Sequence, residues 1–406
     1  MWPTATTTNI VLDSGSTGGT LAVRLREDPS VSMLLLEAGP AKGTLLNNWR
    51  VDMLAAFGST WQSPAFNWMF EGKNETTLND RSIIQPRGKM LGVSSSSNIM
   101  CFIRGHALDF ERWVTEGADD WSWREVLSYL KRMETWQSGE SAWRSGPGQV
   151  HVIQGDYPAD LHEAFIQSGE QAGYAVTDDI NGQHHEGFGA FQMNIYNGMR
   201  TSTAEVCVRF NAGRANLTVE TDALATKVAL VGTRTAGLEI RKGNGQAHTM
   251  RATRELILSG GAVGSPHLVM LWGISPADEL RQHGIDVKVD LPGVGQNLHD
   301  HPLIYMKWRT DKSVSMSKYM RKDLMLCKGA RWLSIHTGPG AANNVERHAV
   351  GCAPTPPIRR AFIPASWLPR ATSSEWRTPS KWGVRSPTSL PIWCMASPRS
   401  IPAPIS

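Results

Sequence analysis

The sequence predicts an α/β fold that begins with a strand, a glycine-containing turn, a helix and a second strand. The apolar run Ile10–Leu12 leads into "DSGSTGG", in which Gly15 and Gly18 have the spacing of the last two glycines of the pattern G-x-G-x-x-G. A second apolar run, "SMLLLEAGP", ends on Glu37. The 406 residues are enough for two domains, or for one large α/β unit with an insertion.

Asp13 stands where this pattern has its first glycine. In a dinucleotide-binding unit the first glycine makes the tight turn, the second lets the backbone reach the pyrophosphate, and the third lets helix and strand pack closely. Aspartate tolerates the left-handed conformation better than most residues, so we expect the turn to form at a cost of roughly 1 kcal/mol. Its negative charge is the larger obstacle, because like charges repel strongly where water is excluded.

Glu37 supports a nucleotide site in residues 9–39. A carboxylate at the end of the second strand can accept hydrogen bonds from both hydroxyls of an adenosine ribose. The helix N-terminus would face the phosphates with its partial positive charge. The alternative is an ordinary strand–helix turn that binds no ligand, and this stretch alone leaves both interpretations open.

The composition argues against several classes of protein. A formal net charge of +4 is small for this length, so we expect no nucleic-acid partner. The five cysteines form no C-x-x-C pair, which argues against a disulfide framework and a metal site and fits a reducing, cytoplasmic compartment. The N-terminus lacks a signal-peptide pattern, and no apolar run approaches the roughly 20 residues of a membrane helix. Peripheral association with the inner membrane stays open.

Further elements follow from apolar spacing and from helix-start signals. Residues 123–133 have helical spacing, and Ser122 with Glu125 three residues later forms a predicted capping box. The stretch "NLTVETDALATKVAL" predicts two strands around a turn. Leu256–Leu258 predicts a buried strand, and we expect the next helix to open near Ser265-Pro266, because proline suits a first helical turn.

The last part of the chain has a different composition. Residues 352–406 hold eleven of the 23 prolines and a single acidic residue, Glu375. Each proline removes a backbone donor and interrupts helices and strand ladders, and no apolar periodicity remains between them. The sequence predicts no element there.

Five stretches occur in a specific order: "SMLLLEAGP", "PRGKMLGVSSSSNIMCFIRGHALDFERW", "EGFGAFQ", "ELILSGGAVGSPHLVMLWGISPADELRQHGI" and "VDLPGVGQNLHDHP". Together they closely resemble the glucose–methanol–choline (GMC) oxidoreductase family of flavoenzymes, from about residue 9 to Glu346. Within that family the chain is most similar to the bacterial branch that oxidises choline and related small alcohols.

The resemblance implies an α/β fold in which a Rossmann-like FAD-binding domain is combined with an α+β substrate domain built on an antiparallel sheet. The expected division is an FAD-binding domain in 1–155 and 201–310, a substrate-domain segment in 156–200, the start of a truncated substrate domain in 311–346, and an unstructured tail in 347–406.

The resemblance also implies a set of cofactor-binding positions. These are Gly15, Gly18, Glu37, Gly92, Asn98, Cys101 and Ala225. Ser97 occupies the position that carries a flavin-linked histidine in some members, so the implied FAD is non-covalent. Members of the family transfer a hydride from an alcohol carbon to flavin N5 while a histidine base takes the hydroxyl proton. A choline-like alcohol and an unidentified electron acceptor are therefore the expected partners.

Several positions depart from the family pattern. Besides Asp13, Val93 replaces the second glycine of a Gly-Gly pair beside the cofactor, where we expect its side chain to clash or to shift the loop. Trp272 replaces a small residue and Ser275 a glycine.

The catalytic segment of the family, which reads roughly H-P-x-G-T-C, has no counterpart in this sequence. His348 follows the matching region too closely to be the base, and His299 and His301 have a structural interpretation as part of the "GQNLHDHP" loop. We therefore expect no catalytic residue in these 406, and a chain that is out of frame or truncated after about residue 346 and inactive. The alternative is a flavin-binding remnant without catalysis.

Overall fold

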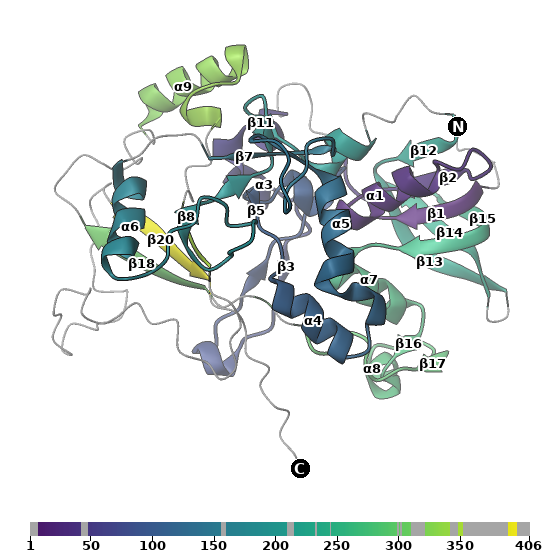
Figure 1. Ribbon diagram of the computed structural model, residues 1–406. Helices are drawn as coiled ribbons and strands as arrows, with labels where there is room; N and C mark the ends of the chain where they lie inside the picture. Colours follow the sequence, from purple (N-terminus) through teal and green to yellow (C-terminus); the bar gives the residue numbers. More distant parts are fainter. Residues whose placement is uncertain are drawn as a thin grey trace. The chain divides into compact units, whose positions relative to one another are not determined.

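A computed structural model describes residues 7–41, 48–155, 160–208, 215–231, 234–243, 245–298, 300, 303–309, 321–341, 348–351 and 389–395. The chain forms two compact units, each built from separate stretches of sequence (Figure 1). The first unit comprises Met1–Met100, Gln149–His151 and Asn194–Leu298, and the second comprises Cys101–Gly148, Val152–Met193 and His299–Ser406. The chain first passes from the first unit to the second at residue 101, which is earlier than the boundary expected at 155. The assignment of cofactor and substrate domains stays a prediction.

The first unit is built on a six-stranded sheet with the order β12-β2-β1-β15-β14-β13. Its strands are β1 (Thr7–Leu12), β2 (Met33–Leu36), β12 (Leu217–Glu220), β13 (Ala223–Val231), β14 (Arg234–Lys242) and β15 (Ala247–Leu258). Its main helices are α1 (Ser16–Leu25) and α7 (Gly261–Leu271). The smaller elements are α2 (Trp49–Asp52), α3 (Gly58–Trp61), α8 (Ala277–Gln282), β3 (Phe70–Glu71), β4 (Ile84–Gln85), β10 (Ile195–Tyr196), β11 (Met199–Arg200), β16 (Ile274–Ser275) and β17 (Val289–Asp290).

Apolar side chains cover both faces of this sheet, as a parallel sheet between helices requires. Val11 and Leu35 face the cluster that includes Ala22 and Val23 of α1. The alternate residues of the same strands, among them Ile10, face the cluster that includes side chains of β13, β14 and α7. The continuous apolar runs that predicted β1 and β2 therefore reflect burial on both sides, and the predicted α/β fold is confirmed.

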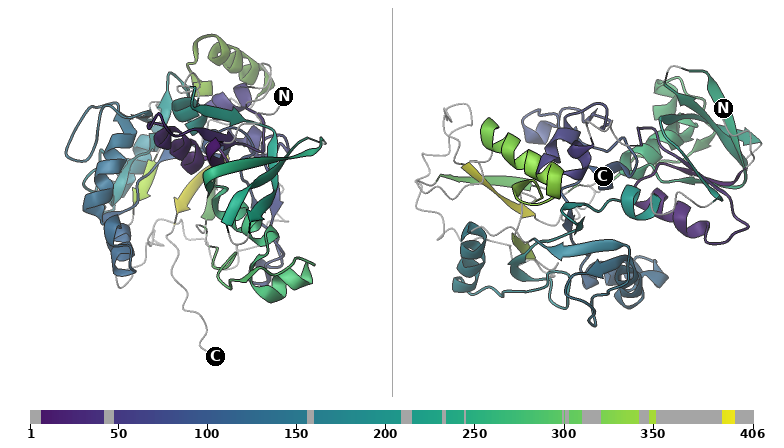
Figure 2. Two further views of the ribbon diagram at one scale, coloured as in Figure 1. Left: turned by 90° about the vertical axis from the view of Figure 1, so that its right-hand side faces the viewer. Right: turned by 90° about the horizontal axis from the view of Figure 1, so that it is seen from above.

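β15 joins the parallel and antiparallel halves of the sheet. Its second half pairs in parallel with β1, for example Val11 with Ile257, and its first half pairs antiparallel with β14. β13, β14 and β15 form a long twisted ribbon (Figure 2). The strand predicted at Leu256–Leu258 is thus the end of a twelve-residue strand. The two strands predicted around Asp222 are confirmed as β12 and β13, which lie at opposite edges of the sheet.

The predicted start of α7 is wrong. The helix begins at Gly261, with Gly260 as its N-cap residue, and Pro266 lies inside it. The small residues before Ser265 predict a turn, because glycine is a weak helix former. In the structure they form the first turn of the helix.

The second unit combines helices with small antiparallel sheets. Its helices are α4 (Ala107–Thr115), α5 (Trp123–Met133), α6 (Asp160–Gln171) and α9 (Lys322–Ile335). Its strands are β5 (Cys101–Phe102), β6 (Glu134–Trp136), β8 (Gly187–Ala190), β9 (Gln192–Met193), β18 (Leu303–Arg309), β19 (His348–Gly351) and β20 (Ser389–Met395), while β7 (Val150–Gln154) has residues in both units. The predicted capping box of α5 is confirmed, because Ser122 and Glu125 exchange both hydrogen bonds.

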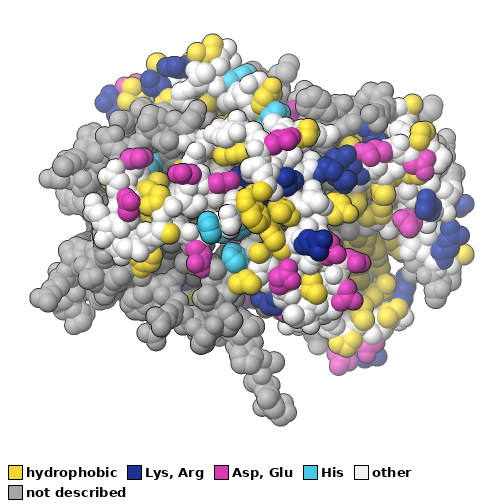
Figure 3. Space-filling view, in the orientation of Figure 1, with side chains coloured by type: hydrophobic (Ala, Val, Ile, Leu, Met, Phe, Trp, Pro, Cys, Tyr) yellow, Lys and Arg dark blue, Asp and Glu magenta, His cyan; other side chains and the backbone are white. Residues whose placement is uncertain are grey.

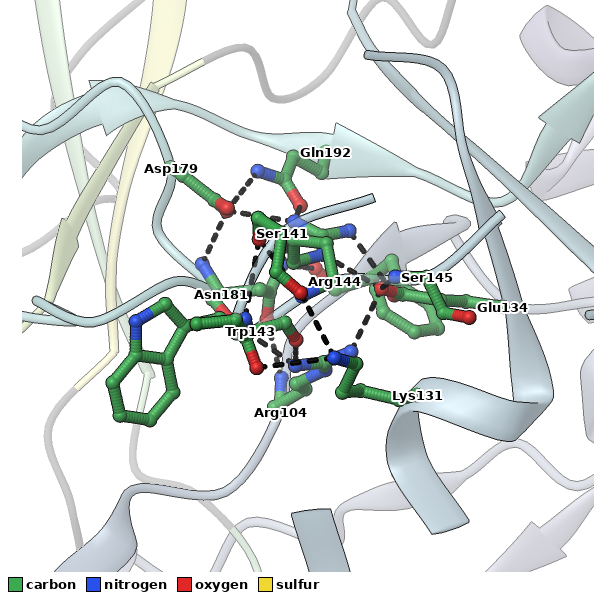
Figure 4. A network of polar contacts seen from close by, with 12 residues as sticks. Arg104, Lys131, Glu134, Ser141, Trp143, Arg144, Ser145, Asp179, Asn181 and Gln192 are labelled. Carbon is green, nitrogen blue, oxygen red and sulfur yellow. Dashed lines mark hydrogen bonds and ion pairs between the residues drawn. The ribbon is translucent and has the colours of Figure 1, made fainter. Parts of the chain in front are cut away.

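Buried charges hold the second unit together (Figure 4). Arg144 forms a bidentate ion pair with Glu134, at 2.7 Å from Nε to Oε1 and 3.1 Å from Nη2 to Oε2. Its Nη1 donates to Asp179 and to Gln192, both at 2.7 Å. Arg104 adds a second cation at 2.8 Å from Glu134. Since Arg144 and Glu134 are almost completely buried, each needs the other to offset the loss of hydration.

Two strands lie in the segment from residue 347, where the sequence predicted no element. β19 pairs antiparallel with β8, and β20 pairs antiparallel with β18. The other positions between 352 and 406 lie outside the described residues. On the face drawn in Figure 3, acidic and basic side chains are interspersed, so neither sign forms a continuous field there.

Candidate functional site

The turn between β1 and α1 has the conformation that the sequence predicted. Asp13 has φ +83°, in the left-handed region, and its N–H donates to Leu36 O at 2.8 Å. Gly15 is the N-cap residue of α1, and no side chain caps that helix end. The Asp13 carboxylate accepts the Gly15 N–H at 2.9 Å. Aspartate therefore makes the turn that the first glycine of the pattern makes elsewhere.

Gly18 has the predicted role of allowing close packing between helix and strand. A Cβ atom added at Gly18 would lie 1.9 Å from the backbone oxygen of Asp13 and 2.4 Å from Ser259 Oγ. Ser259 follows β15 and itself donates to Leu12 O at 2.7 Å. Any side chain at position 18 would push α1 away from the ends of β1 and β15.

Glu37 lies directly after β2 and is 2% exposed. Its Oε2 accepts from Ser14 N at 3.2 Å and from Ser14 Oγ at 2.6 Å, and its Oε1 accepts from Gly39 N at 2.8 Å. Burial, and then the negative charge of Asp13, raise the pKa of Glu37 to about 8. Burial also raises the pKa of Asp13 to about 6, although the Gly15 N–H works in the opposite direction. At neutral pH this pair of carboxyls therefore holds close to one proton.

Gly92 brings a second segment to the same turn. Its φ of +84° is in the left-handed region, and its N–H donates to Ser14 Oγ at 3.1 Å. A Cβ atom at Gly92 would lie 2.3 Å from Ser96 Oγ and 3.0 Å from Ala204 Cβ. Ser14 thus links Gly92 to Glu37 through one hydroxyl. The sequence reasoning missed Ser14, although it lies inside the predicted turn.

Val93 is strained and faces the turn. Its φ of +46° is a rare conformation for a β-branched residue. A Cβ atom built on Gly15 would lie 3.5 Å from Val93 Cβ and 3.7 Å from Val93 Cγ2. The valine side chain therefore lies beside the glycine whose backbone was predicted to meet the pyrophosphate.

Asn98 is held by a buried arginine that sequence reasoning also missed. The Asn98 Oδ1 accepts from Met100 N at 3.1 Å and from Arg200 Nη1 at 2.5 Å. Arg200 also donates from Nε to Val51 O at 3.0 Å, and burial lowers its pKa to about 9. The signal for its position was the Asn197-Gly198 pair, which has positive φ at both residues and closes the β10–β11 hairpin.

The remaining predicted positions lie farther along the chain. Ala225 is in β13, opposite Ile240 of β14, and the N–H of Ala223 at the start of this strand donates to Glu37 O at 2.9 Å. Cys101 begins β5 in the second unit, where it pairs with Met193. The structure thus brings Gly15, Gly18, Glu37 and Gly92 together at the turn of Asp13 and Ser14, while Asn98 and Ala225 lie in the same unit and Cys101 in the other.

The other candidate positions and sites add no reactive group to the turn in the part of the chain that the structure describes. Ser97 is buried, and its backbone oxygen accepts from Trp61 Nε1 at 2.6 Å. His299 and His301 lie outside the described residues. Among the described residues there is no group of three His, Cys, Asp or Glu side chains that could hold a metal ion. None of the described helices combines the length and the apolar character needed to cross a membrane.

Comparison with known proteins identifies relatives along most of the chain. The sequence model of the family described as GMC oxidoreductase matches residues 7–303. Mitochondrial choline dehydrogenase of Mus musculus is 39% identical over 366 residues, which cover 88% of this chain and 61% of that protein. Oxygen-dependent choline dehydrogenase of Brucella ovis is 39% identical over 341 residues, covering 84% and 61% respectively. The chain therefore spans about three fifths of the length of these curated relatives.

Solved structures share the fold. Pyridoxine 4-oxidase from Mesorbium loti superposes with a TM-score of 0.71 at 28% identity, covering 75% of this chain and 60% of that one. An FAD-dependent oxidoreductase from Chaetomium thermophilum superposes with a TM-score of 0.77 at 24% identity, covering 84% and 61%. The family match covers well over half of the sequence, and the identities to curated relatives extend across it.

Proposed function

Because this chain belongs to the GMC oxidoreductase family, we propose that it is an FAD-dependent oxidoreductase that acts on the CH–OH group of a small, choline-like alcohol. The observation that carries this proposal is the hydrogen-bonded series Gly92–Ser14–Glu37 at the first βα turn. In this series the Glu37 carboxylate and the Gly92 backbone lie at the turn that begins α1, where we propose that Glu37 binds the adenosine ribose. The names of curated relatives at 39% identity support choline as the substrate class.

The residues of this turn fit an adenine dinucleotide. Gly18 and Gly92 sit where a Cβ atom would collide with neighbouring atoms, so the backbone is as close-packed as such a cradle requires. Glu37 is a buried carboxylate at the end of β2, which is the position for hydrogen bonds to a ribose. Gly15 would face the phosphates at the start of α1, and Ala225 and Asn98 would contact the adenine end and the flavin. Bound FAD would supply the hydride acceptor for the alcohol carbon.

Turnover needs a proton acceptor in addition to the cofactor. The H-P-x-G-T-C segment that carries this base in the family has no counterpart among the 406 residues. The hydrogen bonds of the described turn join Asp13, Ser14, Gly15, Glu37, Gly39 and Gly92 and include no histidine. We therefore propose that these residues hold FAD but by themselves oxidise alcohol slowly at best. Peripheral membrane association and the electron acceptor stay predictions.

The test is a purification of the full chain followed by FAD titration and dye reduction. We expect saturable FAD binding with the visible absorbance of protein-bound flavin, and little choline-dependent reduction of the dye. Choline should be compared with its uncharged carbon analogue, because an aromatic site for the quaternary ammonium would discriminate between them. Glu37→Ala should lose flavin, whereas Glu255→Ala, on an exposed position of β15, should retain it.

Two outcomes would contradict separate parts of the proposal. A folded chain that binds no FAD at saturating concentration contradicts the cofactor assignment. Rapid oxidation of choline, abolished by one histidine substitution, contradicts the proposed lack of a base and leaves the cofactor assignment intact.

A further inference from the structure

We propose that the Asp13 carboxylate competes with the diphosphate of the cofactor for the same backbone amide. Asp13 already accepts the hydrogen bond of the Gly15 N–H, which an incoming diphosphate would need. This inference rests on the proposed function and concerns a residue by which this chain differs from the glycine pattern. It predicts a turn that is correctly folded for FAD but holds FAD weakly until the Asp13 charge is removed.

The first step of the argument is the position of the carboxylate. Asp13 Oδ1 lies 2.9 Å from the N–H of Gly15, which is the N-cap residue of α1. The first turn of α1 contains no acidic side chain of its own. A helix N-terminus favours one nearby anion, and a dinucleotide fold uses that preference to hold phosphate. In this chain the Asp13 carboxylate already lies at that end of α1, where it accepts the N–H of the N-cap residue Gly15.

The second step is the space around Gly15. A Cβ atom built there would lie 3.2 Å from Asp13 Oδ1 and 3.5 Å from Val93 Cβ. The backbone of Gly15 is thus enclosed by two side chains, both at positions where the family pattern has glycine. Phosphate oxygens that bind the Gly15 amide must displace the Asp13 carboxylate, and the Val93 side chain lies close beside the same glycine.

The third step is the charge. The group that faces Asp13 from the end of β2 is Glu37, which is buried and also acidic. The other described residues that contact the turn, namely Ser14 and Gly15 at the start of α1, Val93 in the adjoining loop and Ser259 after β15, carry no charge. None of these described neighbours carries a positive charge that would neutralise Asp13. A bound diphosphate would therefore bring its negative charges beside the uncompensated negative charge of the Asp13 carboxylate.

The pH dependence follows from the same groups. Protonation removes the charge of Asp13 and frees the Gly15 amide, so acidification should strengthen FAD binding. Because the pKa of Asp13 is about 6, the competition is present at pH 8 and weakens below that value. Glu37 titrates over part of the same range, and protonation of Glu37 acts in the opposite direction on the ribose contact. A variant that lacks only the Asp13 charge is needed to separate the two.

The experiment is a titration of the full chain with FAD, followed by the quenching of flavin fluorescence, at about pH 5 and about pH 8. Asp13→Asn removes the charge and keeps a residue that tolerates the left-handed conformation, and Asp13→Gly restores the glycine of the pattern. Asp28→Asn is the matched control, because Asp28 is an exposed carboxylate of the same unit whose contacts are with Ser30. Circular dichroism confirms that each variant is folded.

We expect Asp13→Asn to bind FAD about tenfold more tightly than wild type at about pH 8, and the gap to narrow at about pH 5. Asp13→Gly should bind at least as tightly as Asp13→Asn, and Asp28→Asn should equal wild type. If only one of the two Asp13 variants folds, its affinity for FAD relative to wild type tests the proposal. If both fail, Glu37→Gln decides, because it removes the opposing titration of Glu37 and its affinity for FAD must then rise on acidification.

Equal affinity of wild type and Asp13→Asn at both pH values overturns the competition and leaves the FAD assignment standing. An affinity of Glu37→Gln for FAD that does not rise on acidification, when neither Asp13 variant folds, has the same meaning. If folded Asp13→Gly and wild type both fail to bind FAD, the proposed cofactor is wrong, and the competition is wrong with it.

Discussion

The carboxyl groups of Asp13 and Glu37 hold two consecutive backbone amides of the first βα turn. Asp13 Oδ1 accepts from Gly15 N at 2.9 Å, and Glu37 Oε2 accepts from Ser14 N at 3.2 Å. Glu37 is buried and Asp13 is partly buried, and the charge of Asp13 raises the pKa of Glu37. The turn that is shaped for a dinucleotide therefore also holds two carboxyls that repel each other once the pH is high enough to ionise both.

The first prediction concerns stability against pH. The pKa of Glu37 rises from 4.5 to about 8 on folding, so the folded state binds more protons than the unfolded state between these values. Its contribution to stability is complete below about pH 4.5 and is lost as the pH rises toward 8, by up to about 1.4 kcal/mol per pH unit. Melting temperatures of wild type should fall relative to those of Glu37→Gln across this range. Parallel curves for the two proteins would contradict the raised pKa of the buried Glu37 carboxyl.

The second prediction concerns the packing of α1. Gly18→Ala places a Cβ atom 1.9 Å from a backbone oxygen, which cannot move without displacing β1. We expect a loss of about 3 kcal/mol or more in the free energy of unfolding, together with loss of bound FAD. Gly264→Ala in α7 is the control, because no atom lies within 4 Å of its added Cβ and alanine favours a helix by about 1 kcal/mol over glycine. Similar stabilities of the two variants, measured by urea unfolding, would refute the close packing.

The third prediction concerns the strain at Val93. Val93→Gly removes a β-branched residue from φ +46° and should release about 1–3 kcal/mol of backbone strain, which offsets the lost packing and the added freedom of the unfolded chain. The variant should be close to wild type in stability and should bind FAD more tightly. Val289→Gly replaces an exposed strand valine without that strain and should cost about 1 kcal/mol. A greater loss in Val93→Gly than in Val289→Gly, with unchanged FAD affinity, would be the contrary result.

The fourth prediction concerns the buried network of the second unit. Arg144→Met leaves Glu134 with Arg104 alone and Asp179 without its arginine, at an expected cost of about 3–5 kcal/mol. Arg112→Met breaks an exposed pair with Glu116 and should change stability by less than about 0.5 kcal/mol. Guanidinium unfolding of both variants provides the measurement. Equal effects would show that the buried network contributes no more than a surface pair.

Features set by neighbouring residues could be predicted from the sequence. The capping box of α5 depends on Ser122 and Glu125, which are three residues apart, and the left-handed turn at Asp13 depends on the tolerance of one side chain. The apolar runs of β1 and β2 identified buried parallel strands for the same reason. At these positions the local sequence preference and the burial of both sheet faces favour the same structure.

Features set by distant partners could not be predicted. Ser14 and Gly92 are 78 residues apart, and Arg200 is 102 residues from Asn98. No spacing rule relates such positions. The early start of α7 was missed for another reason, because packing against the sheet overrides the weak helix preference of its glycines. Most of β15 was missed because its first half carries exposed polar residues and lacks a continuous apolar run.

The most direct measurement of the central claim is a titration of the purified full chain with FAD at about pH 6, with Gly18→Ala in parallel. The account predicts saturable binding of one FAD per chain, a change in the visible spectrum of the flavin, and no binding to the variant. A folded wild-type chain that leaves the flavin spectrum unchanged at every concentration would contradict it.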